Sequence, residues 1–173
     1  MSLPQGYTLR GFEPDDLPVL WDVESAATRQ LAAAGYPELL KQSADPLAFE
    51  AQFAGKGVWI AADENNQAVG YAIAGELADL FWLHQMSVVP SHGRKGIGTA
   101  LLMAVINHAK WAFHSAIGLT TFRDVAFNAP FYEKAGFMRV NPASLSQSLQ
   151  AQLAKECAPG IEVSSRVVMV RRL

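Results

Sequence analysis

Three glycines within six residues, Gly93, Gly96 and Gly98, mark the part of the chain best suited to bind an anion. Glycine lets the main chain approach a ligand without a Cβ and adopts positive φ at no steric cost. The apolar segment that follows predicts a helix, whose first N–H groups lack partners and whose dipole places roughly half a positive charge there. Because Arg94 and Lys95 add positive charge, the segment predicts a phosphate-binding turn.

Two common phosphate motifs do not fit this turn. A P-loop ends in Gly-Lys-Ser/Thr, whereas Lys95 precedes the last two glycines of the turn. A dinucleotide fingerprint needs a small residue at position 101, which is Leu101, although Asp124 lies near the place of its acidic residue. The turn therefore belongs to neither motif.

A second segment with candidate chemistry begins at Asn128, which is suited to start a short helix with Pro130 in its first turn. Tyr132 lies within that helix, and Gly136 and Phe137 follow it. A phenol is protonated at neutral pH, so Tyr132 could donate a proton to a leaving group.

Together these segments resemble the GNAT superfamily of N-acetyltransferases. The stretch 85–102, a strand ending in Val-x-Pro followed by Gly-x-Gly at a helix start, is similar to its acyl-CoA pyrophosphate loop. The stretch 127–137 is similar to its second signature, a short helix with a tyrosine followed by Gly-Phe. The resemblance covers residues 80–140, and the rest fits only in the order of its strands and helices. One departure is Gly93, because the superfamily usually has Gln or Arg at this position. The neighbouring Arg94 can supply the charge instead.

This resemblance implies an α+β fold with a mixed, mostly antiparallel sheet, flanked by helices, in which a splayed strand pair forms the acyl-CoA cleft. It implies acetyl-CoA as cofactor, paired with the main chain at Val88 and Val89, and a nearby N–H group free for the oxyanion. Tyr132 would protonate the departing thiolate. The implied cofactor-binding residues are Met86, Ser87, Val88, Gly93, Arg94, Lys95, Gly96, Ile97, Gly98, Thr99, Asn128, Pro130 and Tyr132.

Three residues compete for the role of general base. Strand alternation predicts two opposite faces in the segment 80–89, with Trp82, His84 and Met86 on one and Leu83, Gln85 and Ser87 on the other. If the first set faces the acceptor cleft, His84 is the best-placed catalytic base, because histidine titrates near working pH. Glu24 and Glu76 are rivals that also fit solvated surface carboxylates, and a weakly basic amine would need no dedicated base.

The resulting expectation is an acetyl-CoA-dependent N-acetyltransferase that acts on a primary amine of a small molecule or peptide. Direct attack in a ternary complex is favoured because the one cysteine, Cys157, lies outside both motifs. One alternative is a catalytically inactive module that binds or senses acyl-CoA. Another is a phosphate-binding regulator without thioester chemistry.

Composition argues against several other classes. The 14 Lys and Arg against 16 Asp and Glu give a formal charge of −2, which disfavours a nucleic-acid partner. No apolar run is long enough for a membrane span, and the first residues lack a signal-peptide pattern, so a cytoplasmic protein is expected. The single cysteine and the spacing of the four histidines predict no disulfide and no metal site. Both a monomer and a homodimer are compatible with the sequence.

The chain has 173 residues, half of them hydrophobic, and is expected to form a single domain over 1–173. Expected strands lie at 7–12, 58–61, 68–73, 80–89, 117–122, 137–140 and 166–170. Expected helices lie at 14–24, 39–53 with a break at 45–46, 96–113, 128–134 and 145–157. Interleaved strands and helices predict a mixed α/β or α+β sandwich.

Overall fold

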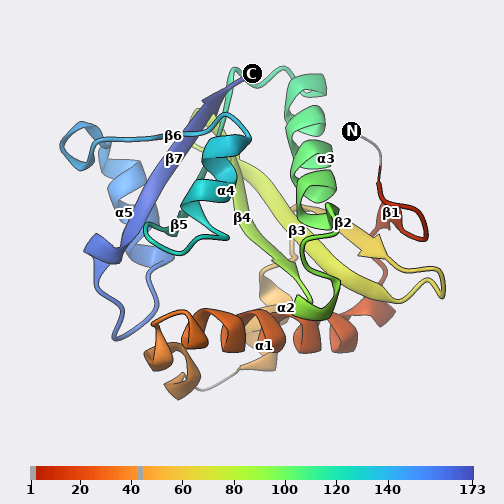
Figure 1. The fold of residues 1–173 in the computed structure, drawn as a ribbon. Coiled ribbons are helices and arrows are strands. Elements are labelled where there is room, and N and C mark those ends of the chain that lie inside the picture. Colours follow the sequence, from red (N-terminus) through yellow and green to blue (C-terminus); the bar gives the residue numbers. More distant parts are fainter. Residues whose placement is uncertain (1–2, 43–44) are drawn as a thin grey trace.

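A computed structural model describes residues 3–42 and 45–173 and has a seven-stranded sheet at its centre (Figure 1). All neighbouring strands are antiparallel except β4 and β5, which confirms the predicted mixed, mostly antiparallel sheet. In spatial order the strands are β1 (Thr8–Gly11), β2 (Gly57–Ala62), β3 (Ala68–Leu77), β4 (Leu80–Val88), β5 (Ala116–Phe122), β7 (Arg166–Arg172) and β6 (Met138–Arg139).

Helices cover both faces of this sheet (Figure 1). One face packs against α3 (Ile97–Trp111) and α4 (Ala129–Lys134), whose apolar side chains share a core with Leu83 and Met169. The opposite face packs against α1 (Leu17–Ala33), α2 (Pro46–Ala51) and α5 (Gln147–Lys155). Among the described residues, no helix has the length and apolar character needed to cross a membrane.

The N-terminal helices differ from the expected ones. The helix expected at 14–24 continues to Ala33 as α1. The helical region expected over 39–53 has the expected break at 45–46 and consists of a 3-10 turn at Pro37–Lys41 and the separate helix α2, because Pro46 can begin a helix but cannot continue one.

The start of α1 is fixed by Asp16. Its carboxylate accepts two hydrogen bonds from Arg10 of β1, both at 2.7 Å, and one from the Glu13 N–H at 2.9 Å. Bidentate Arg–carboxylate pairs constrain orientation as well as distance. The helix that carries Glu24 is therefore tied to the edge strand of the sheet.

The strands β4 and β5 separate soon after they meet. Their parallel pairing is confined to Phe81–Leu83 opposite Ile117–Leu119. Beyond this junction β4 continues to Val88 and β5 to Phe122, and the two strands no longer pair with each other. The splayed strand pair that the resemblance implied is thus present.

A β-bulge at His84 overturns the predicted alternation of β4. Ala74 of β3 pairs with Leu83 and Ile73 with Gln85, so His84 is an extra residue without a partner on β3. A bulge adds one residue to the strand and reverses the faces beyond it. Trp82 therefore shares a face with Gln85 and Ser87, on the side of α1 and α5, whereas Phe81, Leu83, Met86 and Val88 pack with α3 and α4.

Candidate active site

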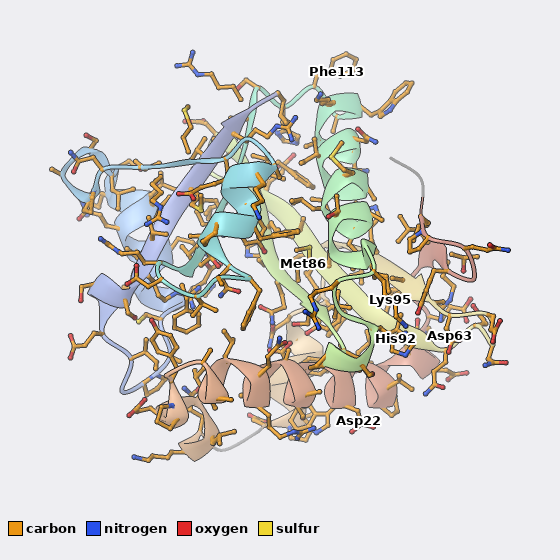
Figure 2. All side chains as sticks on the ribbon, in the orientation of Figure 1. Asp22, Asp63, Met86, His92, Lys95 and Phe113 are labelled. Atoms are coloured by element: carbon orange, nitrogen blue, oxygen red, sulfur yellow. The ribbon has the colours of Figure 1, made fainter. Side chains whose placement is uncertain are left out.

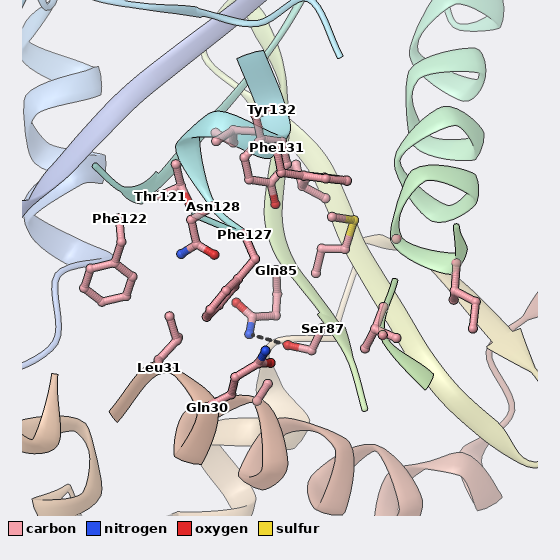
Figure 3. A pocket seen from close by; sticks show the side chains of 18 of the residues that line it. Gln30, Leu31, Gln85, Ser87, Thr121, Phe122, Phe127, Asn128, Phe131 and Tyr132 are labelled. Atoms are coloured by element: carbon pink, nitrogen blue, oxygen red, sulfur yellow. Dashed lines mark hydrogen bonds between the residues drawn. The ribbon is translucent and has the colours of Figure 1, made fainter. Parts of the chain in front are cut away.

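A cavity of about 580 Å³ lies in the split between β4 and β5 (Figure 3). Its walls come from α1, β4, the loop after β4, the first turn of α3, β5, α4 and the start of β7. The cavity does not include Lys95 or Pro130 in its lining. The predicted site residues that line it are His84, Met86, Ser87, Val88, Gly93, Arg94, Gly96, Ile97, Gly98, Thr99, Asn128 and Tyr132.

The turn before α3 presents a row of free main-chain donors to this cavity. In the described part of the chain, the N–H groups of residues 94–99 have no backbone acceptor, and the first bonded amide is that of Ala100, which donates to Gly96 O at 3.0 Å. Gly96 is the N-cap residue of α3 and has a φ of 86°, in the left-handed region that favours glycine. Arg94 also adopts a positive φ, 59°. The local geometry is that of an anion-binding helix start.

Lys95 belongs to a different cluster from its neighbour Arg94. Its Nζ donates to the Tyr7 hydroxyl at 3.1 Å, and that hydroxyl is 2.8 Å from Nδ1 of His92. Figure 2 shows Lys95 and His92 on the side of the loop that faces β1. The loop is therefore tied to the N-terminal segment through the side chain of Lys95, while Arg94 lines the cavity.

The end of β4 offers unpaired main-chain groups to the cleft. The Val89 N–H donates to Val69 O of the β3 side at 2.9 Å. Successive residues of a strand direct their main-chain groups to opposite edges, so the N–H groups of Val88 and Met86 are directed towards β5, which has already separated. This edge can accept an extended ligand as an added strand.

Tyr132 lies on α4 at the same cavity and is 8% exposed. Burial raises the pKa of Tyr132 above its ordinary value, and the positive charge of Arg166 opposes this effect only in part. Among the described residues, no hydrogen bond involves its hydroxyl. The phenol is therefore protonated at neutral pH and can donate a proton into the cavity.

Asn128 occupies the N-cap position of α4, as expected, but caps it with its main chain. Its carbonyl accepts from the N–H groups of Phe131 at 2.9 Å and Tyr132 at 3.2 Å, and its side chain makes no capping bond. Figure 3 shows the Asn128 amide beside Phe127 at the cavity. The side-chain amide is thus left for a ligand.

Glu24 is a cavity residue, contrary to its reading as a solvated surface carboxylate. Its Oε2 accepts hydrogen bonds from the Tyr71 hydroxyl, Gln85 Nε2 and the Ser87 hydroxyl, each at 2.8 Å. Its Oε1 also accepts from Gln85 Nε2 at 2.8 Å. Burial, followed by the nearby Glu24 charge, raises the pKa of Tyr71 well above its ordinary value, which keeps this hydroxyl a donor.

His84 lines the cavity next to a carboxylate that the sequence analysis did not identify, Glu156 at the end of α5. His84 Nδ1 lies 3.6 Å from Glu156 Oε1. Glu156 also accepts from Trp82 Nε1 at 2.9 Å, Thr120 Oγ1 at 2.5 Å and Gln152 Nε2. The carboxylate thus bridges β4 and β5 at the point where they separate.

The pKa of Glu156 reflects two opposing effects. Burial acts to raise it, but the nearby His84 ring and the hydrogen bonds from Thr120, Trp82 and Gln152 outweigh burial and lower the pKa below its ordinary value. Glu156 is therefore ionised at neutral pH beside His84. No sequence pattern could have found this residue, because its partners Trp82 and Thr120 are 74 and 36 positions away.

Arg166, at the start of β7, adds a positive charge to the same wall. Its Nη2 donates to Thr120 Oγ1 at 2.7 Å, and its guanidinium lies 4.9 Å from the centre of the Phe122 ring. Its buried Nε has no hydrogen-bond partner within the described residues. Thr120 thus connects Arg166 to Glu156, and the two opposite charges are close to one another.

Glu76, the third candidate base, lies elsewhere. It borders a second cavity of about 460 Å³, which His84 also lines, and its Oε1 is 3.9 Å from Nε2 of His114. Its side chain is 81% exposed, so it fits a surface carboxylate. Within residues 3–42 and 45–173, no group of three or more potential metal ligands occurs.

Comparison with known proteins identifies the family of this arrangement. Residues 54–139 match the family model described as an acetyltransferase (GNAT) domain. A mycothiol acetyltransferase from Renibacterium salmoninarum is 32% identical over 148 residues, which is 80% of this chain and 42% of that protein. The chain therefore spans about two fifths of the length of this curated relative.

Solved structures extend the likeness to the whole fold. A GCN5-related N-acetyltransferase from Rhodopseudomonas palustris has a TM-score of 0.74 at 22% identity, covering 100% of this chain and 98% of its own. The PaiA N-acetyltransferase from Thermoplasma acidophilum, in complex with coenzyme A, has a TM-score of 0.71 at 16% identity and covers 100% of both chains. At these identities the likeness shows that the fold is shared.

Proposed function

Because the chain belongs to the GNAT superfamily of acetyltransferases, whose acetyl donor is acetyl-CoA, we propose that it transfers an acetyl group to a primary amine of a small molecule or peptide. The observation that carries this proposal is the convergence of free main-chain donors, an open strand edge and Tyr132 at one cavity. We further propose that the protein acts in the cytoplasm as a monomer or homodimer.

The residues around the cavity fit the parts of an acyl-CoA. The N–H groups of residues 94–99 and the Arg94 side chain would hold the diphosphate. The main-chain groups of Met86 and Val88 would pair with the pantetheine arm, and the Asn128 amide lies where it can contact the same arm. When bound, acetyl-CoA supplies a thioester carbonyl that an amine can attack.

We assign three tasks in the transfer to residues of this chain. His84, with Glu156 at its Nδ1, accepts a proton from the acceptor amine. The Val88 N–H stabilises the oxyanion that forms as the nitrogen bonds to the carbonyl carbon. Tyr132 donates its proton to the thiolate when the C–S bond breaks.

Direct attack in a ternary complex is supported by the position of Cys157. Its Sγ donates to Ile161 O at 3.2 Å, and the residue does not line the cavity. Transfer through a covalent acyl-cysteine would need a thiol at the thioester. The amine itself is therefore the proposed nucleophile.

Two measurements test this function. Calorimetry with coenzyme A should show binding, and fragments that lack the pantetheine arm should bind more weakly. Acetyl-CoA consumption should then be followed over amines, amino acids, polyamines and peptides, together with the acceptor of the mycothiol acetyltransferase. Well-folded protein that does not bind coenzyme A would refute the proposal. Binding without consumption with any amine would favour the alternative, an inactive acyl-CoA-binding or sensing module.

A further inference from the structure

Glu24 carries a negative charge into the cavity without a cationic partner. Its four hydrogen bonds come from the neutral groups of Tyr71, Gln85 and Ser87. The ion pairs of the described residues do not include Glu24. Neutral donors fix the position of a carboxylate but leave its net charge in place, so the site attracts a cation.

The two arginines of the cavity do not neutralise this charge. Arg94 lies on the loop at the diphosphate end, and Arg166 is connected through Thr120 to the carboxylate of Glu156. The cavity thus has one cationic end, one balanced pair and one uncompensated carboxylate. The wall that carries Glu24 is therefore suited to a cationic acceptor. It is not suited to the acyl-CoA donor, which is itself anionic.

The carboxylate is also close to where the reaction would occur. Glu24 is bonded to Ser87, the neighbour of both Met86 and Val88, whose main-chain groups are directed into the cleft. Ala27 lines the same wall three residues further along α1, and its small side chain leaves space beside the carboxylate.

We propose that Glu24 binds the acceptor amine as an ammonium ion, so that the preferred acceptors are alkylamines, which are cationic at neutral pH, rather than neutral arylamines. This inference rests on the proposed acetyl transfer and names its substrate class. The ammonium form docks against Glu24 and loses one proton to solvent, which leaves a neutral nitrogen to attack the thioester carbonyl. His84 at the bulge accepts the second N–H proton as the amide forms, and Tyr132 protonates the departing thiolate. Glu24 acts in recognition and is not the base.

The test compares Glu24→Gln with Glu64→Gln, a matched loss of one charge in the exposed turn between β2 and β3. Rates are measured with phenethylamine and related alkylamines, and with aniline and related arylamines. The wild type should prefer the alkylamines. Glu24→Gln should lower kcat/KM for them by about 10- to 100-fold, the value of a hydrogen bond to a charged group. It should lower kcat/KM for arylamines much less than for alkylamines, so that the ratio between the two classes changes, and Glu64→Gln should behave as wild type with both.

Salt provides a second readout that misfolding would not reproduce. Raising the ionic strength from about 0.01 M to about 0.15 M shortens the screening length from about 30 Å to about 8 Å. This should lower kcat/KM for alkylamines in the wild type and have little effect on it in Glu24→Gln.

Several results would overturn the inference while leaving the proposed function standing. They are a preference for arylamines, equal loss of both substrate classes in Glu24→Gln, as expected of a base, and undiminished alkylamine turnover in that variant. Coenzyme A binding with turnover of arylamines but of no alkylamine would also count against it. Failure to bind coenzyme A would instead refute the proposed function itself.

Discussion

The two sides of the cavity recognise their ligands by different means. The donor side, formed by the loop before α3 and the edge of β4, presents main-chain N–H groups that have no acceptor in the described chain. The acceptor side, formed by α1, β4 and the start of β7, presents the side chains of Glu24, His84 and Arg166, and Glu156 lies behind His84 and is linked through Thr120 to Arg166. Main-chain recognition tolerates changes of side chain, whereas a side-chain network depends on each of its members.

This difference predicts which substitutions affect binding and which affect turnover. On the donor side, only changes that alter the backbone path or the local charge should weaken coenzyme A binding. On the acceptor side, and at Tyr132, single polar atoms should control the rate.

The largest effect is expected for Tyr132→Phe, which removes the hydroxyl while keeping the packed ring. Loss of a general acid should lower kcat by about 100-fold or more, while coenzyme A affinity measured by calorimetry should stay the same. Because burial raises the pKa of Tyr132, its deprotonation should not limit the wild-type rate near neutral pH. Undiminished turnover would show that the thiolate leaves without this proton.

Glu156→Gln should lower both rate and stability. The variant keeps the volume of the side chain but removes the charge beside His84 and the strongest acceptor for Trp82 and Thr120. A cost of about 1 to 3 kcal/mol in the free energy of unfolding is expected at pH 7. Urea unfolding gives the stability, and acetyl-CoA consumption gives the rate. A stable variant with wild-type kcat would argue against Glu156 as a support for His84.

The same residue should make stability depend on pH. The pKa of Glu156 lies below its ordinary value of 4.5, so its stabilising contribution is complete above pH 4.5. The contribution is lost as the pH falls through the lower folded-state pKa. The stabilities of wild type and Glu156→Gln should therefore differ at neutral pH and converge in strongly acidic solution.

On the donor side, Gly96→Val should weaken coenzyme A binding more than it changes kcat. Gly96 has a φ of 86°, and a β-branched residue in this left-handed region is strained by roughly 1 to 2 kcal/mol. Relief of that strain would move the adjacent N–H groups, so an affinity loss of about tenfold is expected. Gly98→Ala is the control: a Cβ there would meet only ordinary contacts, the closest being Phe131 at 3.8 Å. Equal affinities in both variants would contradict the role of the backbone path.

The smallest effect is expected from a matched pair on the same loop. Arg94→Ala should raise the coenzyme A dissociation constant by about two- to fivefold, in the range of exposed ion pairs. Lys95→Ala should change it less, because Nζ of Lys95 is bonded to Tyr7 outside the cavity. Titration at low ionic strength would resolve the difference. A larger effect of Lys95→Ala would mean that this side chain turns towards the ligand on binding.

The donor side of the cavity could be predicted from the sequence better than the acceptor side. Gly93, Gly96 and Gly98 are local signals for the backbone of the donor loop, and Tyr132 lies in a recognisable short segment, so the sequence could predict these residues, which the structure brings to one cavity. The contacts of Glu24 with Gln85 and Ser87 cross 61 and 63 positions, and no local pattern encodes them. The faces predicted by alternation were wrong in β4 beyond His84, because no particular residue type marks the position of a β-bulge in a sequence.

The fold itself was largely predictable, since period-2 and helical patterns located every strand and most helices. The exception is the length of α1, which depends on how the N-terminal segment packs against Tyr71 and Ile73, in a strand later in the chain.

The short junction between β4 and β5 should make the two parts of the sheet respond together when a ligand fills the gap between these strands. In the described part of the chain, three residue pairs form the strand pairing between the sub-sheet β1–β4 and the sub-sheet β5–β7. An extended donor lying in the gap would couple the two sub-sheets, so amide hydrogen exchange should slow in β5 and β7 as well as near the loop. At a ligand concentration of about 100 times Kd, binding to the folded state would add about 2.7 kcal/mol to the free energy of unfolding.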